Sequence, residues 1–403
     1  MYTFVLVVFL GDNDADRSEM ISTGAGELFQ LMRDGRPRTR AELVEQTGLA
    51  RTSVVNRLAA LTTVGLVTPT GTAAASGGRP AARLMFDQAS RVCLGIDLGA
   101  THGAVGVLDL SGRILREERH PLSITDGPTE ILTWAIDTAE QLLADIGRTS
   151  SELLGVGVGV PGPVEHSTGR PIRPPIMPGW DGFDIPHFIS ERLRAPVLVD
   201  NDVNLLALGE RATHWPDVND LLFIKVSTGI GAGMIIGGAL QRGARGSAGD
   251  IGHVLVPGVV DDRDLEATAS IPAIAASLSN NGMNLDPSEL IDRVRTGEPN
   301  AIASAREAGR VIGEATAFCV GMLNPSVVVI GGQLGGSVQE IIAGVREVVY
   351  RRSIPLATQH LNIVPAQGGT SAGIRGAGLM VLDSCLDPDS VDRLIARFDQ
   401  NPS

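Results

Sequence analysis

The sequence predicts an α/β protein that is preceded by a small helical unit carrying a β-hairpin. The first observation is a run at 227–253, STGIGAGMIIGGALQRGARGSAGDIGH, which is dense in glycine and lies between apolar segments typical of strands. The second is a pair of apolar segments, 92–98 and 196–199, each of which ends in polar residues. The third is helical periodicity within residues 18–86, where arginine outnumbers acidic residues. A chain of 403 residues is long enough for both parts.

Two helices are predicted at the start of residues 18–86. The first covers 26–33, and its apolar face is formed by Leu28, Leu31 and Met32. The second begins after Thr39, because Glu42 follows three residues later at the spacing of a capping box. A tight turn at 47–50 ends this helix.

A third helix is predicted over 51–61. Its buried stripe is formed by Val54, Leu58 and Leu61. Beyond it, 66–69 and 83–86 are expected to pair as strands around a tip that reads SGGRP. The order helix, helix, turn, helix and hairpin is that of a winged helix-turn-helix.

The outward face of the third helix is short, polar and basic, which suits the major groove of DNA. Residues 18–86 carry eight Arg against five Asp or Glu, whereas the whole chain has a net charge of −13. A locally basic segment on an acidic protein is typical of binding to the phosphate backbone. The alternative is a helix-turn-helix that serves only packing. The residues expected to contact double-stranded operator DNA are Arg40, Arg51, Thr52, Ser53, Asn56, Arg57 and the wing-tip Arg79.

Residues 92–109 are expected to form a strand, a tight Asp-x-Gly-x-Thr turn and a second strand. In a nucleotide-binding interpretation, Asp97 would hold a hydrated magnesium ion and Thr101 would approach a phosphate. Gly99 lies between them in the turn. The alternative is a β-hairpin whose turn simply favours Asp and Gly.

A second polar cluster follows the apolar strand at 196–199. Asn201 and Asp202 stand where this strand ends and a helix begins. Because ligands of open α/β sheets collect at the carboxyl ends of strands, these two residues are placed to contact a substrate. The alternative is that they only cap the helix.

The glycine-dense run offers hydroxyls and bare amides at its start. Thr228, Gly229 and Gly231 have the character of a phosphate cradle. At its end, Asp250 and His253 place a carboxylate and an imidazole three residues apart. A turn with a purely structural role is the alternative.

Five segments in chain order carry a resemblance to the ROK family of repressors, open reading frames and sugar kinases. They are IDLGATH at 96–102, GVGVGVPGPV at 155–164, LVDNDVNLLALGE at 198–210, the glycine-dense run, and NPSVVVIGGQLG at 324–335. Their order and spacing make the resemblance far more specific than any one glycine motif.

The resemblance implies a bilobal sugar kinase/actin-like (ribonuclease H-like) ATPase fold over residues 91–403. The implied small lobe covers about 91–205 plus the C-terminal helix, and the implied large lobe covers about 206–377. A winged helix-turn-helix at 18–86 resembles the DNA-binding domain that precedes the sugar-binding part in repressors of this family.

The resemblance also implies a set of site residues. The implied sugar-binding residues are Asn201, Asp202, Asp250, His253 and Glu266, with Gly169 and Arg170 beside the substrate loop. If the protein were a kinase, Asp202 would be the catalytic base, and ATP and magnesium would be bound by Asp97, Gly99, Thr101, Thr228, Gly229, Gly231, Gly331 and Gly332.

The chain departs from the family pattern at three places. Ala100 and His102 stand where sugar kinases of the family have Gly and Lys, which weakens the case for nucleotide binding. Asp250 replaces a Glu and is one methylene shorter. Residues 253–266 lack the cysteine hairpin that binds zinc in relatives, so His253 would have no thiolate partners and we expect no zinc.

These features together favour a sugar-responsive, DNA-binding transcriptional regulator, namely a repressor of carbohydrate metabolism that acts as a homodimer or homotetramer. One alternative is an ATP-dependent, glucokinase-like sugar kinase with an appended DNA-binding domain. Another is a DNA-binding scaffold whose sugar pocket is inactive. The sequence leaves open the sugar, the operator, and whether ligand releases or promotes DNA binding.

Composition favours a cytoplasmic protein without a membrane role. The three cysteines lack metal or redox spacing: Cys93, Cys319 and Cys385. The apolar residues 1–10 are too few to span a bilayer and lack the basic residues and cleavage site of a signal peptide. We expect residues 1–17 to be disordered or a mis-annotated start. Lys225 is the only lysine, a bias that we ascribe to a GC-rich genome rather than to function.

Overall fold

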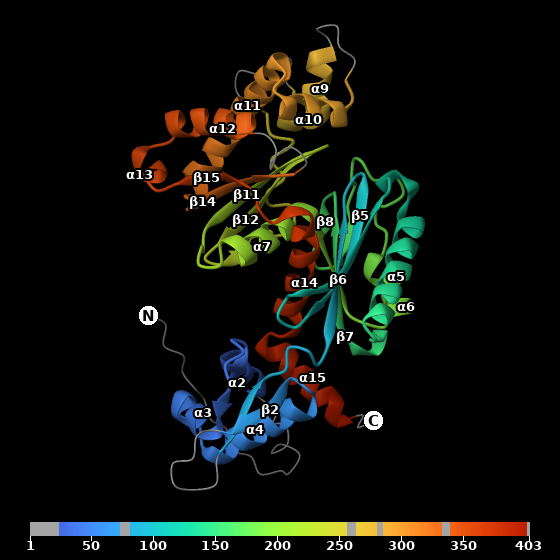
Figure 1. Cartoon of the computed structure of the whole chain (residues 1–403), viewed down its shortest axis with the longest axis vertical. Helices are drawn as coiled ribbons and strands as arrows, with labels where there is room; N and C mark the ends of the chain where they lie inside the picture. The colour runs from blue at the N-terminus through green and yellow to red at the C-terminus, as the bar shows by residue number, and fades with distance from the viewer. Residues whose placement is uncertain (1–23, 73–80, 256–262, 280–284, 333–338, 401–403) are drawn as a thin grey trace. The chain divides into compact units, whose positions relative to one another are not determined.

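The computed structural model describes residues 24–72, 81–255, 263–279, 285–332 and 339–400 (Figure 1). The chain forms two compact units, of which the first holds residues up to Val92, Asp109–Ser111 and residues from Leu382 onward, and the second holds Cys93–Leu108 and Gly112–Val381. The C-terminal helix therefore groups with the first unit and not with the small lobe, where the resemblance implies it. Residues 1–17 lie outside the described residues.

The first unit has the element order of a winged helix-turn-helix. Thr39 and Glu42 form the expected capping box, in which the Glu42 N–H donates to Thr39 Oγ1 at 3.2 Å. Gly48 ends the following helix in the left-handed conformation that a tight turn requires. The elements are α2 (Ala25–Met32), α3 (Arg40–Thr47), α4 (Arg51–Thr63), β1 (Arg38–Thr39), β2 (Val67–Thr72) and β3 (Ala82–Phe86), and the three strands form a sheet in the order β1-β3-β2.

The buried face of α2 differs from the expected one at one position. Leu28 and Met32 are buried, but Leu31 is 40% exposed. Phe29 is buried instead, and its ring meets the ring of Phe86 edge-on at 5.0 Å between centroids. The apolar stripe of this short helix is therefore rotated toward the wing strand.

A C-terminal helix, α15 (Pro388–Gln400), packs against α2 within the first unit. The two helices approach so closely that a Cβ atom on Gly26 would lie 2.0 Å from the carbonyl oxygen of Pro388. Gln30 adds a side-chain hydrogen bond of 2.7 Å to the carbonyl oxygen of Leu386. The last helix of the chain is therefore an integral part of this unit.

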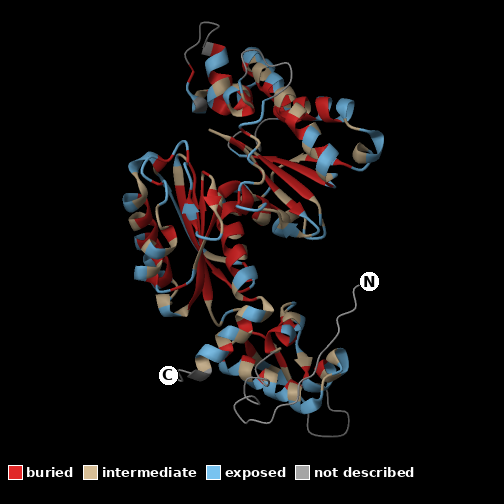
Figure 2. Cartoon of the chain, turned by 180° about the vertical axis from the view of Figure 1, so that it is seen from behind, coloured by how far each residue is buried: buried red, intermediate tan, exposed pale blue. Residues whose placement is uncertain are grey.

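Two five-stranded sheets form the second unit, and Figure 2 shows their central strands as buried. In the first sheet, β10 pairs in parallel with β7, and β5 pairs antiparallel with β6. Its strand order is β10-β7-β4-β5-β6, with β4 (Val92–Leu98), β5 (His102–Asp109), β6 (Ile114–Pro121), β7 (Leu153–Val160) and β10 (Val197–Asn201). The accompanying helices are α5 (Pro128–Asp145) and α6 (Ile185–Leu193).

The second sheet repeats this plan, with an antiparallel part beside a parallel part. Its order is β13-β12-β11-β14-β15, with β11 (Leu221–Val226), β12 (Ile230–Ile236), β13 (Ala239–Leu240), β14 (Val327–Gly331) and β15 (Asn362–Pro365). Helix α7 (Asp202–His214) packs on this sheet, and an apolar core also joins the sheet to α11 (Pro299–Leu323) and α12 (Gln339–Arg352). The duplicated plan is that of the sugar kinase/actin-like fold.

Short elements complete the second unit. They are β8 (Val164–Glu165), β9 (Arg170–Pro171), α8 (Leu265–Ala269), α9 (Ile271–Ser279), α10 (Pro287–Thr296), α13 (Pro355–Thr358) and α14 (Ala372–Cys385), the last of which ends in the first unit. Among the described residues, no helix combines the length and apolar character needed to cross a membrane.

Candidate functional site

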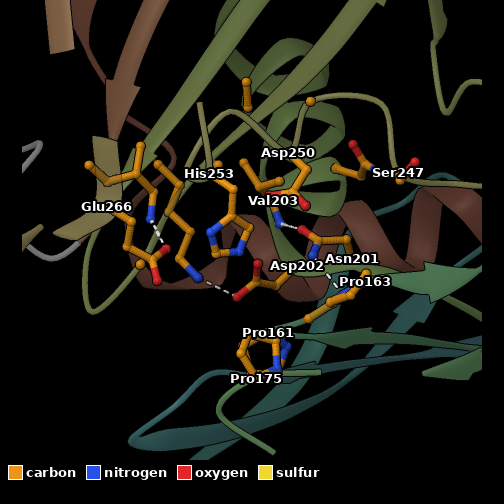
Figure 3. Close-up of a pocket in the computed structure, with 18 of the residues that line it drawn as sticks. Pro161, Pro163, Pro175, Asn201, Asp202, Val203, Ser247, Asp250, His253 and Glu266 are labelled. Carbon is orange, nitrogen blue, oxygen red and sulfur yellow. Dashed lines mark hydrogen bonds and ion pairs between the residues drawn. The ribbon is translucent and has the colours of Figure 1, made fainter. Parts of the chain in front are cut away.

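A cavity of about 330 Å³ lies in the second unit, at the carboxyl ends of β7, β10 and β11 (Figure 3). This volume is at the lower end of the range for small-molecule sites. The cavity is lined by all five expected sugar-binding residues: Asn201, Asp202, Asp250, His253 and Glu266. Segments that are far apart in the sequence therefore meet at one site.

The strand-to-helix junction fixes the orientation of Asn201. Its side-chain oxygen accepts a hydrogen bond of 2.9 Å from the Val203 N–H and caps α7, while its Nδ2 donates to the carbonyl oxygen of Gly162 at 2.8 Å. Both amide atoms retain capacity for one further hydrogen bond each. Asn201 is thus both the expected cap and a preorganised donor and acceptor at the cavity.

Asp202 is the first residue of α7, and its side chain is almost fully buried. Its Oδ2 accepts a hydrogen bond from Lys225 Nζ, which makes an ion pair inside the cavity wall. Burial away from water raises the pKa of the Asp202 carboxyl, while the Lys225 ammonium opposes that shift. The expected site residues do not include Lys225. A usable signal was that Lys225 is the only lysine of the chain.

The lining carries a second group of acidic and basic side chains, which comes from the segments around His253 and Glu266. His253 Nδ1 lies 3.0 Å from Asp264 Oδ2, and this hydrogen bond raises the pKa of His253, with Asp250 and Glu266 acting in the same direction. Glu266 accepts a hydrogen bond of 2.9 Å from the Ile230 N–H. The expected residues are present here, and Asp264 is an additional one that orients the imidazole.

Glu266 also explains one glycine of the cradle-like loop. A Cβ atom on Gly229 would lie 2.7 Å from Glu266 Oε2, so a larger residue would displace the carboxylate. This position therefore needs glycine for packing against a site residue, whether or not the loop binds phosphate.

A buried ion pair braces the loop that forms the cavity rim. Asp200 is 2% exposed; its carboxylate accepts from Arg242 Nε at 2.6 Å and from Asn204 Nδ2 at 2.7 Å. Arg242 belongs to the segment that leads to Asp250. The contact joins the end of β10 to this loop, and neither Asp200 nor Arg242 is among the expected site residues.

The expected nucleotide-binding residues divide into two groups. Those that line the cavity are Thr228, Gly229 and Gly231, and those that do not are Asp97, Gly99, Thr101, Gly331 and Gly332. The His102 imidazole lies over Gly99, where a Cβ atom would be 2.2 Å from its Cε1, and its Nε2 is 3.8 Å from Asp97. A histidine ring therefore covers the turn that would have to approach a phosphate.

Gly169 and Arg170, which were expected beside the substrate loop, do not line the cavity. Arg170 instead forms an ion pair with Asp184 at the start of α6. Arg173 lies at the cavity wall nearby, with its backbone N–H bonded to Asp181 at 2.7 Å. Arg173 is a cation of the wall that sequence reasoning did not identify.

In the first unit, α4 buries Val54, Leu58 and Leu61 as expected. The residues expected to contact DNA are either exposed (Arg40, Arg51, Thr52, Asn56) or half-buried (Ser53, Arg57), and Arg79 lies outside the described residues. The Arg57 guanidinium packs against Gly24, where a Cβ atom would be 2.6 Å from its Nη2. Arg57 therefore also has a contact within the protein.

No group of three or more potential metal ligands occurs among the described residues. At the position where the family resemblance implies a cysteine hairpin, His253 pairs with Asp264 and a backbone bridge joins Leu255 and Asp264. A structural zinc site needs four ligands, and this pair alone would be too few.

The fold and site define an α/β protein of the sugar kinase/actin-like class, preceded by a unit with the element order of a winged helix-turn-helix. The ROK family model matches residues 93–384, and the chain belongs to the ROK family. It is 26% identical over 381 residues to the xylose repressor of Caldicellulosiruptor bescii, covering 89% of this chain and 95% of the relative.

Two solved structures share the fold. One is described as a ROK family transcriptional regulator, a homologue of the E. coli MLC protein; it has a TM-score of 0.79 at 22% identity and covers 94% of this chain and 100% of its own. The other is a ROK family glucokinase from Streptomyces griseus with glucose and AMPPNP; it has a TM-score of 0.62 at 26% identity and covers 72% of this chain and 98% of its own.

Proposed function

We propose that the protein is a sugar-responsive repressor that binds operator DNA through its first unit and a sugar through the cavity of its second. The observation that carries the proposal is the extent of similarity along the chain. The xylose repressor matches 89% of the chain, whereas the glucokinase structure leaves more than a quarter of it uncovered. A sugar kinase would not need the part of the chain that the glucokinase structure leaves uncovered.

The chemistry of the cavity supports a sugar as the ligand. Carboxylates accept hydrogen bonds, while the Lys225 ammonium and the His253 imidazole can donate them. Adjacent hydroxyls of a sugar need both kinds of partner, and buried polar groups left unpaired by a wrong epimer would disfavour it. The exposed face of α4 would enter the major groove, and a homodimer would place two such helices about 34 Å apart.

An ATP-dependent sugar kinase is the second candidate, because Asp202, Thr228 and Gly229 are present at the cavity. Two contacts argue against it. The Lys225 ammonium is paired with Asp202, and its positive charge opposes uptake of a proton by the carboxyl that would have to act as the base. His102 covers the Gly99 turn.

The protein would act in the cytoplasm, where operator DNA and sugar are both present.

Regulation would follow from differential affinity. A sugar that binds one conformation of the protein better than another shifts the population toward it. A tenfold change in operator affinity needs a coupling of about 1.4 kcal/mol, which is within the usual allosteric range. Linkage then requires that operator DNA change sugar affinity by the same factor.

The test begins with operator identification, by sequencing DNA fragments that the purified protein retains. Operator affinity is then measured with D-xylose, D-glucose and N-acetylglucosamine, beside ATP turnover with the same sugars. The proposal expects one sugar to change operator affinity in the wild type and not in Asp202→Asn, whose basal operator binding should be intact. Sugar-dependent ATP turnover would instead support the kinase, and DNA binding that no sugar alters would support a scaffold.

A further inference from the structure

Every basic side chain of this protein other than histidine is arginine, except at position 225. The single lysine does not lie on the surface, where arginine and lysine are readily exchanged. Its side chain is only 17% exposed, and it lines the cavity from β11. A general bias toward arginine does not explain why the one exception lies in the cavity.

The chemistry of an ammonium group differs from that of a guanidinium at this position. Lysine presents a compact charge with three donors, whereas arginine presents a broad planar fork. One donor of Lys225 is used by Asp202 Oδ2. Two donors remain at the cavity beside a carboxylate that can still accept, so the pair offers a donor and an acceptor side by side.

We propose that Lys225 is a ligand-binding residue, and that Lys225 and Asp202 together bind two adjacent hydroxyls of a neutral sugar. This inference rests on the proposed function and names the class of ligand. The ammonium donates to one hydroxyl oxygen, and the carboxylate accepts from the neighbouring hydroxyl. Lys225 would thereby determine which arrangement of adjacent hydroxyls fits.

The other charges of the wall favour a neutral ligand over a sugar phosphate. Asp250 and Glu266 add two carboxylates to the lining of the cavity, and Arg173 adds a cation. The Lys225 charge is already balanced by Asp202, and the His253 imidazole is hydrogen-bonded to Asp264. The lining therefore holds three carboxylates (Asp202, Asp250 and Glu266) against two permanent cations (Lys225 and Arg173), so a phosphate would meet a net negative charge, and like charges repel.

The first test is calorimetric titration with D-xylose, D-glucose, N-acetylglucosamine and glucose 6-phosphate. For a sugar that binds the wild type, Lys225→Met should weaken binding at least tenfold, and Lys225→Arg should also weaken it because the fork does not reproduce the compact ammonium. The control is Arg295→Met, which removes the cation of an exposed ion pair with Asp292 and should leave affinity unchanged.

A double variant separates direct binding from an effect through Asp202. If Lys225 acted only by holding Asp202, Lys225→Met would cost nothing further in an Asp202→Asn background. Direct contact predicts a further loss of sugar affinity in that background. Operator binding and thermal unfolding of each variant report whether the protein is folded, and a folded double variant that binds as Asp202→Asn does would overturn the proposal.

A spectroscopic test uses the single lysine as a probe. Selective ¹³C labelling of lysine gives Cε–Hε signals from one residue in the whole chain. Asp202→Asn should shift these signals without ligand, and a bound neutral sugar should shift them in the wild type. Unmoved signals at sugar saturation, or tighter binding of glucose 6-phosphate, would refute the role of Lys225 while leaving the repressor function intact. If no sugar of the panel bound the wild type, both the proposed function and this inference would fail.

Discussion

The Asp392 carboxylate caps the start of α2 by accepting a 2.8 Å hydrogen bond from the backbone N–H of Gly26. Its other oxygen accepts a bond of equal length from the Gly24 N–H. A side chain near the end of the sequence thus satisfies backbone donors at the start of the first described helix. An acidic group at this helix end is also favoured by the helix dipole.

Asp392→Ala should therefore destabilise the first unit by about 1 kcal/mol, the usual value of an N-terminal cap. Chemical denaturation of the full chain measures this change. The matched control is Asp389→Ala, because Asp389 is an exposed acidic residue in the first turn of α15, the helix that carries Asp392. This substitution should have little effect. Equal stability of Asp392→Ala and wild type would contradict the capping role.

The second prediction concerns α4. Asn56→Ala should cost about 1–3 kcal/mol of operator binding and relax base preference, because Asn56 lies exposed on the face that would enter the groove. Thr63→Ala at the far end of the same helix is the control. Gel-shift titrations with the operator and with mismatched DNA measure both effects. If the two variants bound alike, another element would have to read the bases.

Features that depend on residues close in sequence could be predicted. The Thr39–Glu42 capping box is one, because spacing alone decides it. The position of Asn201 between strand and helix is another. The prediction that Leu31 is buried is wrong, because a helix of eight residues leaves its buried face ambiguous. The buried residue is Phe29, and its partner ring, Phe86, lies far along the chain.

Features that depend on distant contacts could not be read from the sequence. Lys225 reaches Asp202 only because α7 packs on the sheet that contains β11. Asp264 meets His253 although the two residues are 11 positions apart in the sequence. The position of Asp392 beside Gly26 requires the two ends of the chain to fold together. In each case the residue type alone gave no indication of its partner.

The third prediction is a pH dependence from the His253–Asp264 pair. The folded pKa of His253 is raised above 6.5, so its stabilising effect is full below 6.5 and is lost as the pH rises through the folded value. The pKa of Asp264 is lowered below 3.8, so its effect is present above 3.8 and is lost as the pH falls through the folded value.

The pair should therefore stabilise most between these two values, by less than about 1 kcal/mol because it is partly exposed. His253→Gln should flatten the decline in unfolding free energy on the alkaline side of 6.5. His187→Gln, which removes an exposed histidine on α6, is the control. Parallel pH profiles for His253→Gln and wild type would show that the pair does not stabilise the fold.

The fourth prediction concerns metal. Residues 253–266 contain no cysteine, so the purified protein should hold no stoichiometric zinc. A chelator should leave the unfolding temperature unchanged, and elemental analysis should agree. One equivalent of tightly bound zinc per chain would show that other residues supply the missing ligands.

The last prediction concerns the ion pair between Asp200 and Arg242, called the brace below. Removing Arg242 leaves the carboxylate of Asp200 buried with Asn204 as its remaining side-chain donor, and breaking one partner of a buried pair costs on the order of 3 kcal/mol. Arg242→Gln should therefore lower the free energy of unfolding. It should also weaken sugar binding, because the same loop carries Asp250.

Arg245→Gln is the matched control, since Arg245 is exposed in the same loop. It removes the same charge from the loop without uncovering a buried partner, so stability and sugar affinity should stay near the wild-type values. A double variant, Asp200→Asn with Arg242→Gln, should recover part of the lost stability, because the buried site then holds no uncompensated charge. If Arg242→Gln and Arg245→Gln behaved alike in denaturation and in sugar titration, the brace would not position the cavity rim.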